Sequence, residues 1–391
     1  MYTRRQLIKQ AAVLGLSAFY FKNLNFDAIA EEISFPEKNK DLIVLSPRPP
    51  LLETPTKYFK ELITPKEALF VRWHLSGIPT YINLDEFRLK VSGNVENPLE
   101  LTIQDLMTKF EPVEYVAVIQ CAGNGRSYVK PSVPGSQWKY GAMGNVKWTG
   151  ARLKDILNKA GIKKGSVDVV FNGLDVPPMP TTPDVVKSIP IDELFDDIIV
   201  AYKMNDEPMP MLNGFPLRLI VPGWYASLWV KSLSDITVTD KEFDGFWVKS
   251  AYRIPDNPCK CIGPGETPQK TKPVHRMRTY SIIIDPTNIK VVNVGEKVKI
   301  MGVAFSGGYS VNQVLVSIDG GKSWVKANLG KDLGRYSWVQ WFYEFTPKKK
   351  GDYTVIVQAI NSIGEGQPIK GLWNPSGYEW NEIQKLTIKV V

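Results

Sequence analysis

Residues 291–329 read VVNVGEKVKIMGVAFSGGYSVNQVLVSIDGGKSWVKANL, and this stretch decides the fold of the C-terminal part of the chain. Apolar and polar residues alternate along it, which is typical of strands that bury one face. Asp319-Gly320-Gly321 separates two such runs and is typical of a hairpin turn. The alternation continues to the C-terminus, so we predict a β-sandwich over residues 276–391.

Residues 61–275 have a different pattern, in which short β-rich runs alternate with short helical stretches. The helical stretches are expected around residues 103–110, 151–161 and 190–199. The strands do not recur at the spacing of βαβ units, so we predict an α+β domain with mixed sheets. Before this domain, residues 31–60 are rich in Pro, Lys and Glu and predict an extended lead-in on the surface.

The first 30 residues predict an export signal. TRRQLIK at residues 3–9 fits the twin-arginine pattern, and an apolar stretch too short to span a membrane follows at residues 11–21. Ala28-Ile29-Ala30 offers a cleavage site, and an amphipathic first helix is the alternative. No other apolar run is long enough to cross a bilayer, so we expect a folded protein exported to the periplasm, with no membrane insertion of the mature chain.

Charge and composition exclude several functions. The chain of 391 residues carries 48 Lys+Arg and 40 Asp+Glu, and removal of residues 1–30 leaves 44 − 39 = +5. That excess is too small to indicate nucleic-acid binding. Three Cys cannot form a disulfide framework, and there is no CxxCH sequence for attachment of a c-type haem. Any redox cofactor must therefore be held by other groups, and its electrons must pass to a partner.

Cys121 is the first candidate functional residue. It ends the apolar run of VAVIQCAGNGRS and begins a Gly-rich turn that would let the backbone approach a bulky ligand. Arg126 follows five residues later, and a nearby cation favours the thiolate, the form that binds metals. One thiolate is a sparse protein contribution, so most ligands of such a metal would come from a cofactor. The alternative is a small buried core residue.

A second group of candidates could bind an anion. Alternation along LFVRWHLSG would point Arg72 and His74 to the same face, and with Arg126 they could form a pocket for a small oxyanion. The Tyr252 phenol could hydrogen-bond that anion or relay a proton. The alternatives are an exposed Arg, a structural His and a packing Tyr.

Two cations in apolar strands and one pair of cysteines are further candidates for binding a cofactor or a metal. Arg218 and Lys231 each lie on an apolar strand, where a cation needs a carboxylate or a cofactor phosphate. Cys259 and Cys261 are metal-like in type, but nothing nearby supplies two further ligands, so idle or exposed thiols are the preferred interpretation.

Several motifs in this order resemble the molybdenum domain of sulfite oxidases and bacterial sulfite dehydrogenases. They are FVRWH (70–74), QCAGNGR (120–126), QWKYGAMGNVKWTGARLKDIL (137–157), AYKMNDEPMPMLNGFPLRLIVPG (201–223), VKSL (230–233) and KSAYRIPDN (249–257). GLWNPSGYEWN (371–381) is similar to that family's immunoglobulin-like dimerisation domain. The resemblance covers roughly residues 60–391.

The resemblance implies a single molybdenum-molybdopterin with Cys121 as the only protein ligand of the metal. It also implies that Arg72 and Arg126 hold the oxyanion, with Tyr252 near the metal and His74 on the pterin or the pocket wall. The positions implied for the cofactor are Arg72, His74, Cys121, Asp175, Asn213, Arg218, Trp229 and Lys231, of which Asp175 is the weaker match. Arg335 is a candidate for a further substrate arginine supplied by the sandwich.

The activity implied by the resemblance is oxidation of sulfite to sulfate, with single electrons passing to a separate c-type cytochrome. A homodimer through the C-terminal domain is also implied. The alternatives are a sulfane-sulfur dehydrogenase or a methionine-sulfoxide reductase with the same cofactor, and a secreted binding protein without catalysis. The methionine-sulfoxide reductases resemble the chain less, because they lack the sandwich and the paired arginines.

Overall fold

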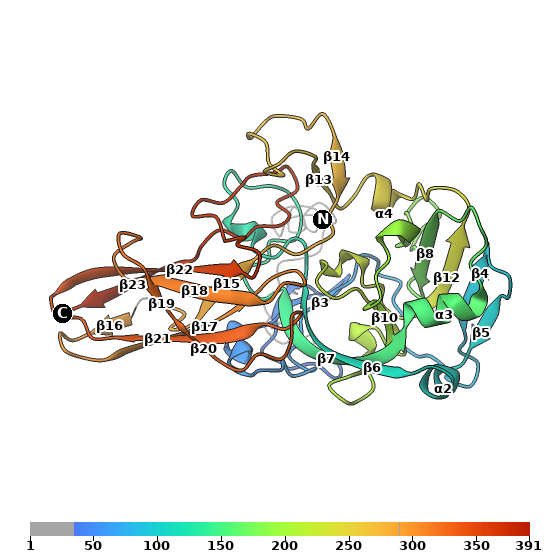
Figure 1. Cartoon of the computed structure of the whole chain (residues 1–391), viewed down its shortest axis with the longest axis horizontal. Coiled ribbons are helices and arrows are strands. Elements are labelled where there is room, and N and C mark those ends of the chain that lie inside the picture. The colour runs from blue at the N-terminus through green and yellow to red at the C-terminus, as the bar shows by residue number, and fades with distance from the viewer. Residues whose placement is uncertain (1–34, 289) are drawn as a thin grey trace, which may run out of the picture. The chain divides into compact units, whose positions relative to one another are not determined.

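The computed structural model describes residues 35–288 and 290–391, which Figure 1 draws as ribbon. The chain divides into two compact units, residues 1–40 and residues 41–391. The described part of the first unit, residues 35–40, consists of turns and irregular backbone. The predicted export signal at residues 1–30 lies outside the described residues. Within the described ranges, no helix is both long enough and apolar enough to cross a membrane.

Two sheets form the first part of the larger unit. The strand orders are β11-β10-β7-β6 and β5-β4-β12-β8-β9, and β12 pairs in parallel with β4 but antiparallel with β8. The strands are β4 (Leu89–Gly93), β5 (Leu99–Leu101), β6 (Pro112–Gln120), β7 (Met143–Arg152), β8 (Asp168–Gly173), β9 (Lys187–Pro190), β10 (Ile199–Met204), β11 (Arg218–Ile220) and β12 (Leu233–Thr239). The prediction of an α+β domain with mixed sheets is confirmed.

Two of the three expected helical stretches form α-helices. The helix α2 (Ile103–Thr108) begins with a capping box in which Thr102 and Asp105 exchange side-chain and backbone hydrogen bonds. The helix α3 (Leu153–Ala160) ends at Gly161, whose φ of 72° is readily adopted only by glycine.

The prediction of a third helix over residues 190–199 is wrong. Only a single 3-10 turn forms there, η3 (Ile191–Glu193), and the chain then enters β10. Ile198 and Ile199 are almost completely buried and lead into this strand, which lies between β7 and β11. The apolar run therefore belongs to an interior strand that is buried on both faces, and not to one side of a helix.

The segment before residue 61 is more ordered than the sequence indicated. A small sheet joins β1 (Ile43–Ser46), β2 (Leu51–Glu53) and β3 (Val71–Arg72), and the 3-10 helix η1 (Thr56–Lys60) follows β2. Leu52 and Phe59 have no exposed surface. Because these apolar side chains pack into the protein, residues 51–60 are part of the folded core, while β1 lies on the surface as predicted.

The C-terminal part is the predicted β-sandwich, coloured orange to red in Figure 1. Its sheets have the orders β15-β17-β21-β20 and β16-β23-β22-β18-β19. The strands are β15 (Tyr280–Asp285), β16 (Lys290–Val292), β17 (Val298–Phe305), β18 (Val311–Ser317), β19 (Val325–Lys326), β20 (Asn328–Leu329), β21 (Val339–Phe345), β22 (Gly351–Asn361) and β23 (Lys385–Val390). The expected hairpin at Asp319-Gly320-Gly321 joins β18 to β19.

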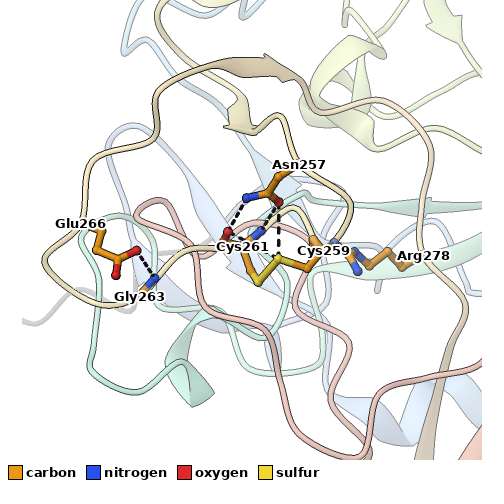
Figure 2. Close-up of a disulfide and its surroundings, with 6 residues drawn as sticks. All are labelled: Asn257, Cys259, Cys261, Gly263, Glu266 and Arg278. Atoms are coloured by element: carbon orange, nitrogen blue, oxygen red, sulfur yellow. Dashed lines mark hydrogen bonds between the residues drawn. A yellow bond between two sulfur atoms is a disulfide. The ribbon is translucent and has the colours of Figure 1, made fainter.

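A disulfide links Cys259 and Cys261, so the interpretation of these residues as idle thiols is wrong. They lie between the short paired strands β13 (Arg253–Pro255) and β14 (Thr271–Pro273), which follow the helix α4 (Phe246–Lys249). Figure 2 shows how Asn257 fixes the turn: its side chain donates to the Cys261 carbonyl (2.7 Å) and accepts from the Cys261 N–H (3.1 Å). Lys260, with φ of 56°, turns the chain so that the two sulfurs meet.

Glu379 connects this loop to the C-terminal region. Its carboxylate is 1% exposed and pairs with Arg278 (2.7 Å) and Lys260 (3.1 Å). We expect Glu379→Gln to lower the free energy of unfolding by about 2–4 kcal/mol, because two partly buried cations lose their common anion. Chemical denaturation measures this change. Glu344→Gln is the matched control: Glu344 pairs with two exposed lysines, so its loss should cost under about 1 kcal/mol. Equal losses would contradict the buried role of Glu379.

Candidate active site

Cys121 lies immediately after β6, at the wall of a pocket with about 450 Å³ of free space including its open mouth. The thiol is not in a disulfide, and the residue is 8% exposed. Its N–H donates to the Ala142 carbonyl (2.9 Å), which fixes the start of the turn. A Cβ atom at Gly123 would lie 2.5 Å from the Arg126 guanidinium, so a larger residue there would displace that guanidinium.

His74 and Tyr252 meet at the same pocket although 178 positions separate them. His74 Nε2 lies 2.5 Å from the Tyr252 hydroxyl. Burial and the positive charges of Arg72, Lys187 and Lys231 hold the pKa of His74 well below its usual value. Burial raises the pKa of Tyr252, so both groups are neutral at pH 7. Tyr252 also has φ of 56°, an unfavourable conformation for a tyrosine that is typical of functional sites.

Arg72 ends the short strand β3 and lines the pocket beside His74, as the alternation predicted. One of its guanidinium nitrogens donates to the Trp73 carbonyl. This hydrogen bond leaves further N–H donors of the guanidinium for an anion.

Arg126 lies close to the pocket but is not among the residues that line it. Its guanidinium donates to the carbonyls of Ser376 and Ser136, both at 2.9 Å. It also faces the ring of Tyr378 at 5.2 Å, and Tyr378 stacks on Tyr252 with 5.3 Å between ring centroids. Two stacked aromatic rings, those of Tyr378 and Tyr252, therefore lie between the Arg126 guanidinium and the pocket.

Arg218 and Lys231 supply positive charge to another part of the wall. Arg218 Nη1 donates to the Asn213 carbonyl (2.8 Å), and burial lowers its pKa to about 9. Lys231 lies over the ring of Trp73 at 4.3 Å, and burial together with the Arg218 charge lowers its pKa to about 7. The carboxylate of Asp175 partly opposes that shift. Within the described part of the chain, no carboxylate forms an ion pair with Arg218 or Lys231, which fits a site for an anionic ligand.

The structure brings most of the predicted site residues together. Those that line the pocket are Arg72, His74, Cys121, Asn213, Arg218, Lys231 and Tyr252. Three predicted residues lie outside the lining. The charge of Asp175 raises the pKa of Lys231, and the Arg126 guanidinium faces the ring of Tyr378. Trp229 is a buried side chain whose ring centroid lies 5.9 Å from that of Trp148.

Sequence reasoning missed Lys187 and Ser227. Ser227 lines the pocket, and Lys187 lies behind Tyr252 with 2% exposure. Lys187 has the signal that identified Arg218 and Lys231, a single cation in an apolar strand, and the same rule would have found it. Ser227 has no sequence signal that separates it from other serines.

The residues present fit a molybdopterin. Among the described residues, no group of three or more His, Cys, Asp or Glu side chains could hold a metal, so a metal at Cys121 needs its other ligands from a cofactor. Arg218 Nε and Ser227 Oγ are buried and have no hydrogen-bond partner among the described residues. Such groups suit a phosphate, which accepts hydrogen bonds and carries negative charge.

Arg335 does not reach this pocket. It pairs with Asp197 and is 57% exposed, and the Tyr336 hydroxyl donates to the same carboxylate (2.7 Å). We therefore expect Arg335→Met to leave the KM for an anionic substrate of this pocket within about twofold, because an exposed ion pair contributes little and lies outside the site. Steady-state kinetics measures this, and a tenfold rise in KM would place Arg335 in the substrate pocket.

Comparison with known proteins identifies two families along the chain. Residues 75–247 match the oxidoreductase molybdopterin binding domain, and residues 271–391 match the Mo-co oxidoreductase dimerisation domain. Mitochondrial sulfite oxidase of Drosophila melanogaster is 33% identical, over 91% of this chain and 64% of that protein. Sulfite oxidase of Arabidopsis thaliana is 30% identical, over 88% of this chain and 92% of that protein.

A solved structure has a similar fold. The sulfane dehydrogenase SoxCD from Paracoccus pantotrophus superposes with a TM-score of 0.74 and 25% identity, over 88% of this chain and 85% of that chain. The human mitochondrial sulfite oxidase is 31% identical, over 91% of this chain and 67% of its own length. The chain thus spans about two thirds of the length of the animal relatives named here.

The matched domains agree with the pocket geometry. The first domain binds molybdenum-molybdopterin, and Cys121, Arg218 and Lys231 lie within its matched residues, while Arg72, His74 and Tyr252 line the same pocket from just outside them. The β-sandwich coincides with the second domain. The chain belongs to the sulfite oxidase family of molybdopterin oxidoreductases and carries that family's dimerisation domain.

Proposed function

We propose that the protein oxidises sulfite to sulfate and passes single electrons to a separate c-type cytochrome. The observation that carries this proposal is the pocket in which the free Cys121 thiol, the Arg72 guanidinium and the Tyr252 hydroxyl meet. A pocket rich in cations suits a doubly charged oxyanion. Relatives that cover nearly the whole chain are sulfite oxidases by name, which supports the substrate.

Each residue of the pocket has a separate role in the proposed reaction. Molybdenum-molybdopterin, with Cys121 as the protein ligand of the metal, supplies the two-electron redox chemistry and the oxygen transfer. Arg72 binds a substrate oxygen and lowers the energy of the charge that shifts during oxidation, because its guanidinium is already in place. Tyr252 orients the substrate through its hydroxyl. Neutral His74, in the tautomer with its proton on Nε2, donates to that hydroxyl and so leaves the phenol proton for the anion.

Several features outside the pocket belong to the same proposal. The paired Arg4 and Arg5 support export to the periplasm by the twin-arginine route, which carries folded proteins. The dimerisation domain at residues 271–391 supports a homodimer. A separate cytochrome is the proposed acceptor because the sequence has only two His and no CxxCH.

A second candidate function is oxidation of sulfane sulfur. The superposition on the sulfane dehydrogenase SoxCD favours it, because that chain shares both domains of the fold. Anaerobic titration of the purified enzyme separates the two candidates, with reduction of added cytochrome c as the signal. We expect sulfite to reduce two equivalents of cytochrome c per molecule oxidised. Reduction by protein-bound sulfane sulfur, without reduction by sulfite, would overturn the first proposal in favour of the second.

A further inference from the structure

Lys187 is a buried cation that the sequence motifs do not assign to the site. It begins β9 at an edge of its sheet and is 2% exposed. Its ammonium donates to the Trp247 carbonyl (3.0 Å) and lies 4.2 Å from the ring centroid of Tyr252. The Trp247 ring is also close, with its centroid 5.4 Å from the ammonium. Lys187 therefore lies against the ring of Tyr252, a residue that lines the pocket.

A second cavity lies beside Lys187 and borders the main pocket. Lys187, Trp247 and His275 line this cavity, and it shares Tyr252 and Ser227 with the pocket that contains Cys121. The two cavities therefore share the part of their walls formed by Ser227 and Tyr252. A charge at Lys187 acts on an anion in the main pocket across this wall and not by direct contact.

The charges around Lys187 do not balance it. Among the described residues, no carboxylate forms an ion pair with its ammonium, and the charges that act on it are those of Arg72 and Lys231. Burial and these two cations hold the pKa of Lys187 well below its usual value. The other titratable side chains on this side are His74, Tyr252 and His275, and burial shifts the pKa of each toward its neutral form. The contacts that favour the charged form of Lys187 are the Trp247 carbonyl and the two aromatic rings around the ammonium, and an anion that enters the pocket stabilises this form further.

Contacts place Lys187 on the substrate side and not on the phosphate side. Lys187 contacts Tyr252 and Trp247, and Trp247 lies edge-on to His74 at 4.6 Å. Arg218 instead faces Trp148, at 5.7 Å. The cations thus form two groups, and Lys187 belongs with the residues expected to bind the oxyanion.

We propose that Lys187 is a specificity-determining residue whose charge, placed behind the Tyr252 ring, makes the pocket prefer doubly charged oxyanions to singly charged ones. The proposal rests on the proposed function for its substrate, sulfite. It also gives the pocket a further cation, a role that Arg335 does not fill because it pairs with Asp197. The Coulomb energy between Lys187 and a bound anion grows with the charge of the anion. The loss of Lys187 therefore weakens the binding of a dianion more than the binding of a monoanion.

Kinetics and ligand binding of molybdenum-loaded Lys187→Met test the proposal. We expect its KM for sulfite to rise about tenfold with kcat within about threefold of wild type. The inhibition constant of sulfate should also rise about tenfold while that of nitrate changes less than twofold. Lys187→Arg, which keeps the charge, should restore the preference for sulfate. The control is Lys90→Met, which removes an exposed lysine on β4 and should change nothing.

A second readout does not depend on turnover. Sulfate should raise the unfolding temperature of the loaded wild-type protein, and Lys187→Met should abolish most of that rise. If the wild type fails to oxidise sulfite, the proposed function is wrong, and this temperature shift alone decides the role of Lys187. Unchanged sulfate stabilisation in the variant, or none in the wild type, overturns the proposal.

Three kinetic or chemical results would also contradict the role of Lys187. An unchanged KM for sulfite, or an equal rise in the inhibition constants of sulfate and nitrate, would show that the residue is only structural. A fall in molybdenum content would show that the charge serves the cofactor. If Lys187→Met does not fold, Lys187→Gln is measured in the same way, because it removes the charge and keeps a polar group against the Trp247 carbonyl.

Discussion

Cys121→Ser is expected to lower kcat for sulfite by at least about 10³-fold, the equivalent of about 4 kcal/mol in activation free energy. Cys121 is the free thiol at the pocket wall, and a serine hydroxyl remains protonated where a thiol becomes a metal-binding thiolate. The fold should persist, because the two side chains have similar size and the Gly-rich turn stays in place. Steady-state kinetics and thermal unfolding measure the two effects.

A cysteine control separates loss of the metal ligand from loss of any thiol. The double variant Cys259→Ser/Cys261→Ser removes the disulfide, whose residues do not line the pocket, and should keep sulfite oxidation within about threefold of wild type. Near-normal turnover in Cys121→Ser would contradict its assignment as the metal ligand. Loss of turnover in both variants, with both folded, would mean that the assay reports something other than the pocket.

Arg126→Met is expected to raise the KM for sulfite by roughly 10- to 100-fold with a smaller fall in kcat. The variant removes a cation near the pocket and two partly buried hydrogen bonds, to the carbonyls of Ser376 and Ser136. It should also release Tyr378, on which Tyr252 stacks, so the substrate-binding hydroxyl becomes less well placed. Kinetics over a range of sulfite concentrations gives both constants.

Arg126→Lys is the control, since it keeps the charge but cannot reach both carbonyls with one planar group. Its KM should lie between those of the wild type and Arg126→Met. If KM is unchanged in Arg126→Met, Arg126 has no part in substrate binding, and its role is to hold the segment around Ser376.

The sequence predicted those features that depend on neighbours along the chain. Alternation placed Arg72 and His74 on one pocket wall, and the Gly-rich turn after an apolar run placed Cys121 at a strand end. Alternation and one hairpin turn also predicted the sandwich.

The remaining features depend on contacts between distant parts of the chain. The contact of Lys187 with Tyr252 joins positions 65 residues apart, and no local pattern indicates which aromatic ring a buried lysine will meet. Arg126 matches a motif, yet its guanidinium is held by a carbonyl 250 positions away. The wrong prediction of a helix at residues 190–199 has the same cause. The apolar residues at its end pair with the distant strand β7 and form part of a sheet.

The disulfide shows a different limit. Cys259 and Cys261 are close in sequence, but only the turn at Lys260, held by Asn257, brings their sulfurs together. Spacing alone does not separate this geometry from two free thiols.

Metal and cofactor analysis of the purified protein tests the central claim most directly. The protein is produced with its own residues 1–30 in a host that makes molybdopterin, and molybdenum is measured per chain. We predict about one molybdenum and one molybdopterin per chain in the wild type. A protein that folds normally and contains no molybdenum would contradict the claim that Cys121 and the surrounding cations form a molybdenum site.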